Sequence, residues 1–173
     1  MKIFNGLDKL NIDTASVIVL GKFDGVHLGH QKLLSEAKNY AKQISALLIA
    51  IVVDTDNDHI MGKEKQEELL NEFGVDCLIR CRIEDIKDIK AEEFISDYLV
   101  DKLCMKAIVA GEDVRFGYKA LGDAAMLDSM SHLGYEPIII EKVCLLGDVI
   151  SSTRIRTAIA NGEETVAKKL LGR

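Results

Sequence analysis

The sequence has little of what marks a membrane or secreted protein. Its longest apolar runs are residues 46–53 and 17–20, and both are well short of the roughly 20 apolar residues that a membrane-spanning helix needs. The first six residues have neither the apolar stretch nor the small-residue cleavage site of a secretory signal. We therefore expect a cytoplasmic protein that has no membrane partner.

Clustered positive charge is also scarce. The chain has 22 Lys and Arg against 28 Asp and Glu, which gives a net charge of −6. This balance argues against a broad nucleic-acid surface, because such surfaces concentrate basic residues, and we expect no nucleic-acid partner. A small anionic ligand is still compatible, since a few local donors and a helix N-terminus can hold it.

Neither metal-binding cysteine pairs nor linkers are present. The four cysteines, Cys77, Cys81, Cys104 and Cys144, lack the C-x-x-C spacing of structural zinc sites, so we expect reduced thiols and assign no metal ligands. There is no repeat, low-complexity tract or Pro/Gly/Ser-rich linker, and the one proline, Pro137, stands at the start of an expected strand, where it is tolerated. Residues 1–173 are therefore expected to form one domain.

What is present is a regular alternation of apolar runs and helical patterns. Continuous β-branched runs predict buried strands at 16–20, 47–53, 77–81, 107–110 and 137–140. Helices are expected between them at 28–44, 64–73, 91–103 and 122–133. This order predicts an α/β fold with a Rossmann-like, doubly wound parallel sheet. After it we expect a short strand at 148–150 and a small C-terminal helical segment, split at Asn161-Gly162.

The segment at residues 21–30, Gly-Lys-Phe-Asp-Gly-Val-His-Leu-Gly-His, follows the first buried strand and begins the first helix. In a doubly wound sheet this is the position of the ligand crevice. The missing Cβ atoms at Gly21, Gly25 and Gly29 let backbone N–H groups approach phosphate oxygens at a helix N-terminus. The segment 21–25, which includes Lys22, Phe23 and Asp24, is thus expected to cradle the phosphates of a nucleotide.

His27 and His30 are three residues apart in this segment. On the first turn of a helix that spacing places both imidazoles on one face, toward bound phosphates, where they can stabilise a transferring phosphoryl group by hydrogen bonding. The alternative is a capping or packing role, which is common for a single histidine near a helix start. The pair at this site favours the catalytic interpretation, although either histidine alone can be a positioning residue.

The residues 21–30 resemble the signature of the HxGH nucleotidylyltransferases, and more closely that of the FAD synthetase module of bacterial bifunctional riboflavin kinase/FAD synthetases. Three further segments match that family in order: residues 74–76 after a helix containing Lys65, residues 111–117 (Gly-Glu-Asp-Val-Arg-Phe-Gly), and residues 150–156 (Ile-Ser-Ser-Thr-Arg-Ile-Arg). The resemblance runs from the first strand to the last residue. It implies an FMN adenylyltransferase that uses ATP with Mg²⁺ and makes FAD from FMN.

The second and third segments also supply expected site residues. Gly111 and Asp113 follow the fourth predicted strand and should reach the same sheet edge; the resemblance assigns Asp113 to the nucleotide and acceptor site, while an Asx-turn role is equally compatible. Residues 151–153 should open a helix, one hydroxyl acting as N-cap, so that Ser152, Thr153 and Arg156 can hold the leaving pyrophosphate. The resemblance makes Arg156 functional, and we expect Arg154 to be solvated.

The chain departs from the family pattern in three places. Residues 52–58 lack the family's aromatic-Asp/Glu-Pro-His-Pro run and the stretch up to Lys65 is shortened, while Val114 replaces a usual Phe. Both changes weaken a stacking platform for a flavin. Residues 167–173 resemble the sequence that joins the synthetase module to the riboflavin kinase module, so we expect a module without the kinase, either stand-alone or cut at that boundary.

Three functions remain open on the sequence. The first is transfer of AMP from MgATP to FMN by in-line attack, without a covalent enzyme intermediate. The second is the same chemistry on another phosphate acceptor, such as nicotinamide mononucleotide, phosphopantetheine or a polyol phosphate. The third is a non-catalytic flavin- or nucleotide-binding module. The metal ligands and the oligomeric state are not assigned.

Overall fold

A computed structural model of the chain describes residues 1–7, 10–54 and 59–173. Six strands form one sheet in the order β1-β4-β3-β2-β5-β6, and every neighbouring pair is parallel. The bounds are β1 Lys2–Asn5, β2 Ser16–Gly21, β3 Leu47–Asp54, β4 Cys77–Arg82, β5 Met105–Gly111 and β6 Glu136–Ile140. The predicted α/β class and Rossmann-like doubly wound sheet are confirmed.

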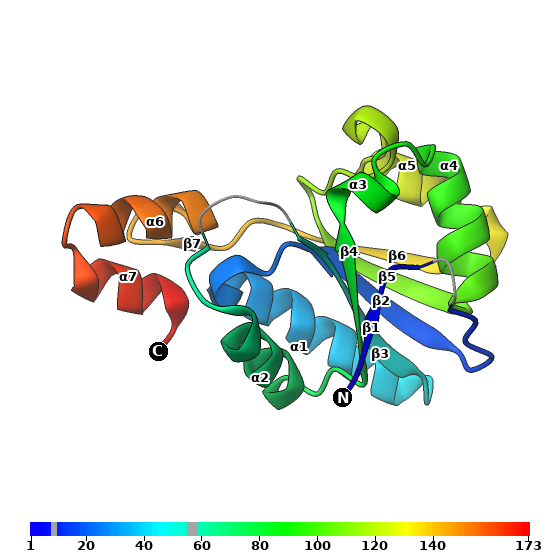
Figure 1. Cartoon of the computed structure of the whole chain (residues 1–173), viewed down its shortest axis with the longest axis horizontal. Helices are drawn as coiled ribbons and strands as arrows, with labels where there is room; N and C mark the ends of the chain where they lie inside the picture. The colour runs from blue at the N-terminus through cyan, green and yellow to red at the C-terminus, as the bar shows by residue number, and fades with distance from the viewer. Residues whose placement is uncertain (8–9, 55–58) are drawn as a thin grey trace.

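Helices cover both faces of the sheet (Figure 1). One face carries α1 (Leu28–Gln43) and α2 (Lys63–Glu72); the other carries α4 (Ala91–Glu93), which continues as the π-helix η2 (Phe94–Lys102), and α5 (Ala124–Ser129). Because side chains alternate along a strand, Val17 and Val19 of β2 pack toward α1 and α2, whereas Ile18 and Leu20 pack toward η2 and α5. The central strands β2, β3 and β5 are apolar on both faces for this reason.

The structure differs from the prediction at one strand and one helix. The edge strand β1 was not predicted, since it is only four residues long and mostly exposed. The helix expected at 122–133 begins at Ala124 instead, because Gly122 pairs with Phe116 in an antiparallel bridge and Asp123 caps the helix by accepting from the Met126 N–H at 2.9 Å. That helix also ends early, at Ser129, and a short 3₁₀ turn, η4 (Ser131–Leu133), follows it.

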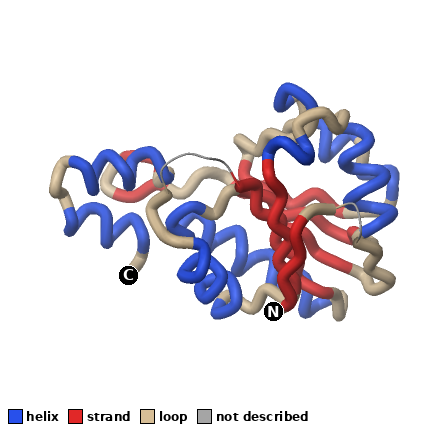
Figure 2. Tube along the Cα trace, viewed as in Figure 1, coloured by secondary structure: helices blue, strands red, loops and turns tan. Residues whose placement is uncertain are grey.

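The C-terminal residues form a group beyond the carboxyl ends of the strands, apart from the helices that cover the sheet (Figure 2). A two-stranded hairpin, β7 (Cys144–Leu145) and β8 (Asp148–Val149), leads into α6 (Ser152–Ala160) and α7 (Glu164–Leu171). These helices share a small apolar cluster built around Ile150, Ile155 and Leu170. In the described part of the chain, no helix has the length and apolar character required to cross a membrane.

Candidate active site at the end of strand β2

The site lies where the chain changes direction across the sheet. From β2 the chain runs outward to β3 and β4, and it then returns to place β5 on the other side of β2. The loops that leave β2 and β5 therefore diverge at the carboxyl edge, and this divergence creates the crevice in which open α/β sheets bind ligands. The segment Gly21–His30 leaves β2 at that point, as the sequence predicts.

The turn after β2 has an unusual backbone. Phe23 and Val26 have positive φ angles of 50° and 39° and are fully buried. Residues Asp24–Val26 form the 3₁₀ turn η1. Non-glycine residues with bulky side chains seldom adopt such angles, and they persist only where the surroundings fix them. The turn must therefore be held from outside.

The holding groups are side chains of distant elements. All five main-chain carbonyls of residues 22–26 accept hydrogen bonds from side chains outside the turn. Gln66 donates to the carbonyl of Lys22 at 2.9 Å and to that of Phe23 at 3.1 Å. The carbonyl of Asp24 accepts from Ser152 at 2.9 Å, and that of Gly25 accepts from Arg173 at 2.7 Å. The carbonyl of Val26 accepts from Gln31 at 2.9 Å. The donors come from α2, α6, the end of the chain and α1, so the turn takes its shape only once these elements have assembled.

Asp24 joins the turn to Arg156. Its side chain is 7% exposed, and its Oδ2 accepts from the Arg156 Nη1 at 2.6 Å. Its Oδ1 accepts from the main-chain N–H of Ile60 at 2.8 Å. Because the buried carboxylate is paired and hydrogen-bonded, it can hold the Arg156 guanidinium in a defined place on the wall of the crevice.

The two histidines stack on each other. Their ring centroids lie 3.7 Å apart with an angle of 15° between the planes. His27 is the N-cap of α1, with extended backbone, and its Nδ1 accepts from the His30 N–H at 3.4 Å. The prediction that both residues belong to the first helical turn is wrong for His27, which precedes the helix, although both rings do lie on one side of it.

Burial determines the charge of the two histidines. Burial lowers the pKa of His27 to about 4, against a weaker opposing effect of Asp24. Burial, and secondarily the charge of His27, also lowers the pKa of His30. Both imidazoles are therefore neutral near pH 7, and with its Nδ1 accepting, His27 carries its proton on Nε2. The Nδ1 of His30 is sealed from solvent and has no hydrogen-bond partner among the described residues.

Two glycines of the motif make room for ring side chains. A Cβ on Gly29 would lie 3.2 Å from the His27 imidazole, and a Cβ on Gly21 would lie 3.3 Å from the Phe23 ring. Gly25 has a φ of 81°, and a Cβ there would lie 3.0 Å from Ile60 Cδ1 and 3.2 Å from Leu171 Cδ2. These steric requirements act in addition to the close phosphate approach that the sequence predicts.

A cavity of about 210 Å³ opens beside the turn. It lies between the ends of β2 and β3, helix α2 and the first turn of α6, where Ser151 caps the helix by accepting from the Arg154 N–H at 3.2 Å. Its lining includes three cationic side chains and the free N-terminus of a helix, a combination suited to an anion. The lining residues are Lys22, Asp24, Val53, Asp54, His59, Met61, Lys63, Gln66, Ser152, Thr153 and Arg156.

The cavity brings together five of the predicted site residues: Lys22, Asp24, Ser152, Thr153 and Arg156. Gly21, Phe23, Gly25, Gly29, His27 and His30 shape or follow the turn and do not line this cavity. Gly111 is the last residue of β5, Asp113 lies in the loop that follows, and neither lines the cavity. The Asp113 side chain is 67% exposed and pairs with Lys142 at 3.4 Å. The departure noted at residues 52–58 falls partly outside the described residues, at 55–58.

Arg154 is not solvated as expected. Its Nη1 donates to the main-chain carbonyls of Leu145 and Asp148, both at 2.9 Å, and its side chain is only 22% exposed. These contacts tie the β7–β8 hairpin to α6. The sequence predicted different roles for Arg154 and Arg156, but it could not show that the β7–β8 hairpin contacts Arg154.

The sequence interpretation missed Gln66, Arg80 and Asp54. Gln66 lies on the apolar stripe of α2 with Leu69 and Leu70, and Arg80 interrupts the apolar strand β4. A polar group on an apolar face is the signal that could have identified them, because such groups are buried only with partners.

Comparison with known proteins gives one consistent family. The FAD synthetase family matches residues 9–154. A bifunctional riboflavin kinase/FMN adenylyltransferase of Buchnera aphidicola from Schizaphis graminum is 30% identical over 100% of this chain and 60% of its own length. A protein of the same description from Listeria monocytogenes is 32% identical over 92% of this chain and 54% of its own.

The fold has a solved counterpart. A crystal structure described as a macrolide-efflux protein from Streptococcus pneumoniae superimposes with a TM-score of 0.88 and is 29% identical. The match covers 99% of this chain and 60% of that one. The chain thus spans between 54% and 60% of the length of these three proteins.

Proposed function

Since the chain belongs to the FAD synthetase family, we propose that it transfers the adenylyl group of MgATP to the phosphate of FMN. A phosphate oxygen of FMN attacks the α-phosphorus, the bond from that phosphorus to the bridging oxygen of the β-phosphate breaks, and FAD and pyrophosphate are formed. The observation that carries the proposal is the cationic cavity at the end of β2, adjoining a turn that ends in two stacked, neutral imidazoles.

In this proposal the cavity holds the β- and γ-phosphates. Lys22 and Arg156 supply positive charge, and the first-turn N–H groups of Ser152 and Thr153 have no partner within their own helix. The Ser152 hydroxyl already donates to the Asp24 carbonyl at 2.9 Å. Its main-chain N–H is therefore the better phosphate ligand, and the hydroxyl acts by fixing the turn.

The histidines act as uncharged hydrogen-bond donors. His27 presents its Nε2–H because its Nδ1 is occupied by the His30 N–H. A donor that is already in place stabilises charge on the α-phosphoryl group as bonds rearrange, and a neutral imidazole needs no counter-ion when the pocket is empty. Neither histidine is required to form a bond to phosphorus.

Magnesium enters this scheme as part of the substrate. In the described residues no three His, Cys, Asp or Glu side chains form a group that could hold a metal ion. The two cavity carboxylates are already paired, Asp24 with Arg156 and Asp54 with Arg80 and Lys63. Phosphate oxygens and water are the ligands that Mg²⁺ commonly takes in such a case.

The test is formation of FAD. The purified chain is incubated with ATP, Mg²⁺ and FMN, and products are separated by chromatography beside a His27→Ala/His30→Ala variant whose folding is checked by circular dichroism. We expect FAD from the unmodified chain, and a rate at least about 100-fold lower from the variant. Equal rates in both proteins would remove the histidines from the mechanism.

A second candidate keeps the chemistry and changes the acceptor. It is motivated by Val114, a half-buried aliphatic side chain at the position where an aromatic ring would support flavin stacking. Pyrophosphate release measured across FMN, nicotinamide mononucleotide, phosphopantetheine and polyol phosphates, with ATP or CTP, separates the two. Turnover only with a non-flavin acceptor would show that FMN is not the acceptor. Tight ATP binding without turnover on any acceptor would support a non-catalytic binding module.

A further inference from the structure

Gln66 contacts the turn after β2 from helix α2. Its Nε2 donates to the carbonyl oxygen of Lys22 at 2.9 Å and to that of Phe23 at 3.1 Å. A primary amide nitrogen has two N–H donors, so one side chain can satisfy both carbonyls. Gln66 is only 8% exposed, and the two bonds lie away from bulk water.

The orientation of this amide is set by Arg80. The Nη2 of Arg80 donates to Gln66 Oε1 at 2.9 Å. A guanidinium has donors and no acceptor, and it therefore requires the oxygen of the amide to face it. The amide nitrogen must then face the carbonyls of Lys22 and Phe23. In the reversed orientation the amide N–H groups would face the Arg80 guanidinium, and the amide oxygen would face the two carbonyl oxygens.

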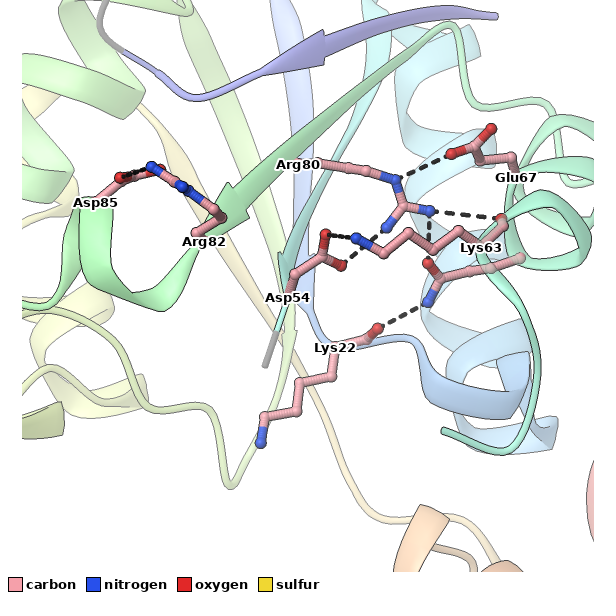
Figure 3. A network of polar contacts seen from close by, with 8 residues as sticks. Lys22, Asp54, Lys63, Glu67, Arg80, Arg82 and Asp85 are labelled. Carbon is pink, nitrogen blue, oxygen red and sulfur yellow. Dashed lines mark hydrogen bonds and ion pairs between the residues drawn. The ribbon is translucent and has the colours of Figure 1, made fainter. Parts of the chain in front are cut away.

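Arg80 is itself held by two carboxylates. Its Nη1 donates to Asp54 Oδ1 at 2.9 Å and its Nε to Glu67 Oε1 at 3.0 Å, while its side chain is 7% exposed. Figure 3 shows the resulting chain of contacts, which runs from the ends of β3 and β4 through α2 to the Lys22 carbonyl. The Lys22 side chain extends in the opposite direction from its carbonyl (Figure 3).

The carbonyls that Gln66 holds belong to the strained part of the turn. Phe23 has a φ of 50° and a fully buried ring. A release of the Phe23 carbonyl would allow its peptide to relax to a commoner geometry, and this would rotate Lys22 relative to the cavity. The contact is thus located where a small backbone change alters a residue of the cavity wall.

We propose that Gln66, oriented by Arg80, is a positioning residue that sets the Lys22–Phe23 peptide for binding of the nucleotide phosphates. The inference rests on the proposed function, in that it takes ATP as the occupant of the cavity. It concerns residues outside all the motifs of the sequence. Gln66 also lines the cavity, but its amide nitrogen is bonded to the Lys22 and Phe23 carbonyls and its amide oxygen to Arg80. In this proposal Gln66 and Arg80 therefore act through Lys22.

The primary test is Gln66→Met. Because Gln66 also lines the cavity, the substitution keeps the length and the neutrality of the side chain and removes only the amide that donates to the two carbonyls. We expect the dissociation constant for ATP, measured by calorimetry with Mg²⁺, to rise about tenfold, which corresponds to two lost hydrogen bonds. The KM for ATP should rise in the same proportion with kcat reduced less, and the melting temperature should change by only a few degrees.

Arg80→Lys is the second variant. It keeps a cation near Asp54 but lacks the planar fork that reaches Gln66, so ATP should bind about threefold more weakly. The matched control is Arg82→Lys, two residues further along the chain, where the side chain is 74% exposed and pairs with Asp85 at the start of α3 (Ile83–Ile86). Figure 3 shows this pair apart from the Gln66 network, and its ATP affinity should be unchanged.

The outcomes separate the inference from the proposed function. Folded Gln66→Met protein that binds ATP within twofold of the unmodified chain would overturn the inference. If that variant does not fold, ATP binding within twofold by Arg80→Lys would do so. ATP binding without FAD formation by the unmodified chain defeats only the FMN assignment. If the unmodified chain does not bind ATP, both the inference and the proposed function are wrong.

Discussion

The strands of the sheet and the turn after β2 are adjacent in the chain but are stabilised in different ways. The strand residues Val17–Leu20 are almost completely buried between two layers of helices, and apolar contact holds them. The turn at residues 22–26 is held by hydrogen bonds from four separate elements to its carbonyls. We therefore expect the sheet to contribute most of the free energy of unfolding, whereas the strained backbone of the turn lowers it.

The largest effect on stability is expected in the sheet. Leu78 of β4 is fully buried, and Leu78→Ala should lower the free energy of unfolding by about 4 kcal/mol, because it removes apolar contacts and leaves a cavity. Urea unfolding at pH 7.5 measures the change. Leu121→Ala, at a side chain that is 67% exposed, is the control and should change stability by less than about 0.5 kcal/mol. Equal effects would contradict the assigned core.

The turn should be more sensitive to pH than the sheet. Above pH 6.5 His27 is neutral in both the folded and the unfolded states; as the pH falls, the unfolded imidazole takes up a proton first, since the folded pKa is about 4. Stability should fall by about 2 kcal/mol by pH 5 and about 3 kcal/mol by pH 4, then level off. The urea midpoint of unfolding, measured from pH 7 to pH 4, should depend less on pH in His27→Gln than in the unmodified chain. If the midpoints of both proteins change with pH in parallel, His27 is not the cause of the pH dependence.

A third change tests the packing of the turn. Gly25 has a φ of 81°, and an added Cβ would lie 3.0 Å from Ile60 Cδ1, so Gly25→Ala should cost about 2 kcal/mol. Gly134→Ala provides the comparison, because Gly134 has a φ of 92° and no atom within 4 Å of the added Cβ. It should cost about 1 kcal/mol, from backbone strain alone. Thermal unfolding that gave Gly134→Ala the larger loss would show that contact at Gly25 is unimportant.

The smallest effect concerns the helix that follows the hairpin. The Ser151 hydroxyl accepts from the Arg154 N–H at 3.2 Å, and Ser151→Ala should lower stability by about 1 kcal/mol. Thr165→Ala, on the exposed side of α7, should be near neutral. If the two substitutions have the same effect on the urea midpoint, the cap contributes little.

The fold could be predicted from the sequence to a large extent. Continuous apolar runs separated by amphipathic stretches identify five of the six strands of the sheet and the helices α1 and α2 nearly to the residue. The missed strand β1 has only four residues and one partner, β4, so it leaves no periodic signal. The early start and end of α5 depend on a bridge between Phe116 and Gly122, a contact that hydrophobic periodicity does not register.

The site could be predicted only in part. The motif residues Lys22, Asp24, Ser152, Thr153 and Arg156 converge on one cavity, and the roles assigned to them and to the histidines stay predictions. The charge state of the histidines and the ion pair of Asp24 with Arg156 depend on burial and distance, which a linear pattern does not contain.

The sequence by itself determined the class of fold, the edge of the sheet at which the cavity opens and the motif residues that line it, because these depend on local patterns and on the order of elements. The tertiary structure alone decided how the turn is held. Gln66, Ser152 and Arg173 are between 40 and 150 residues away from the carbonyls to which they donate, and no local rule relates such positions. Their contacts exist only when parallel strands and three separate helices have packed around one peptide segment.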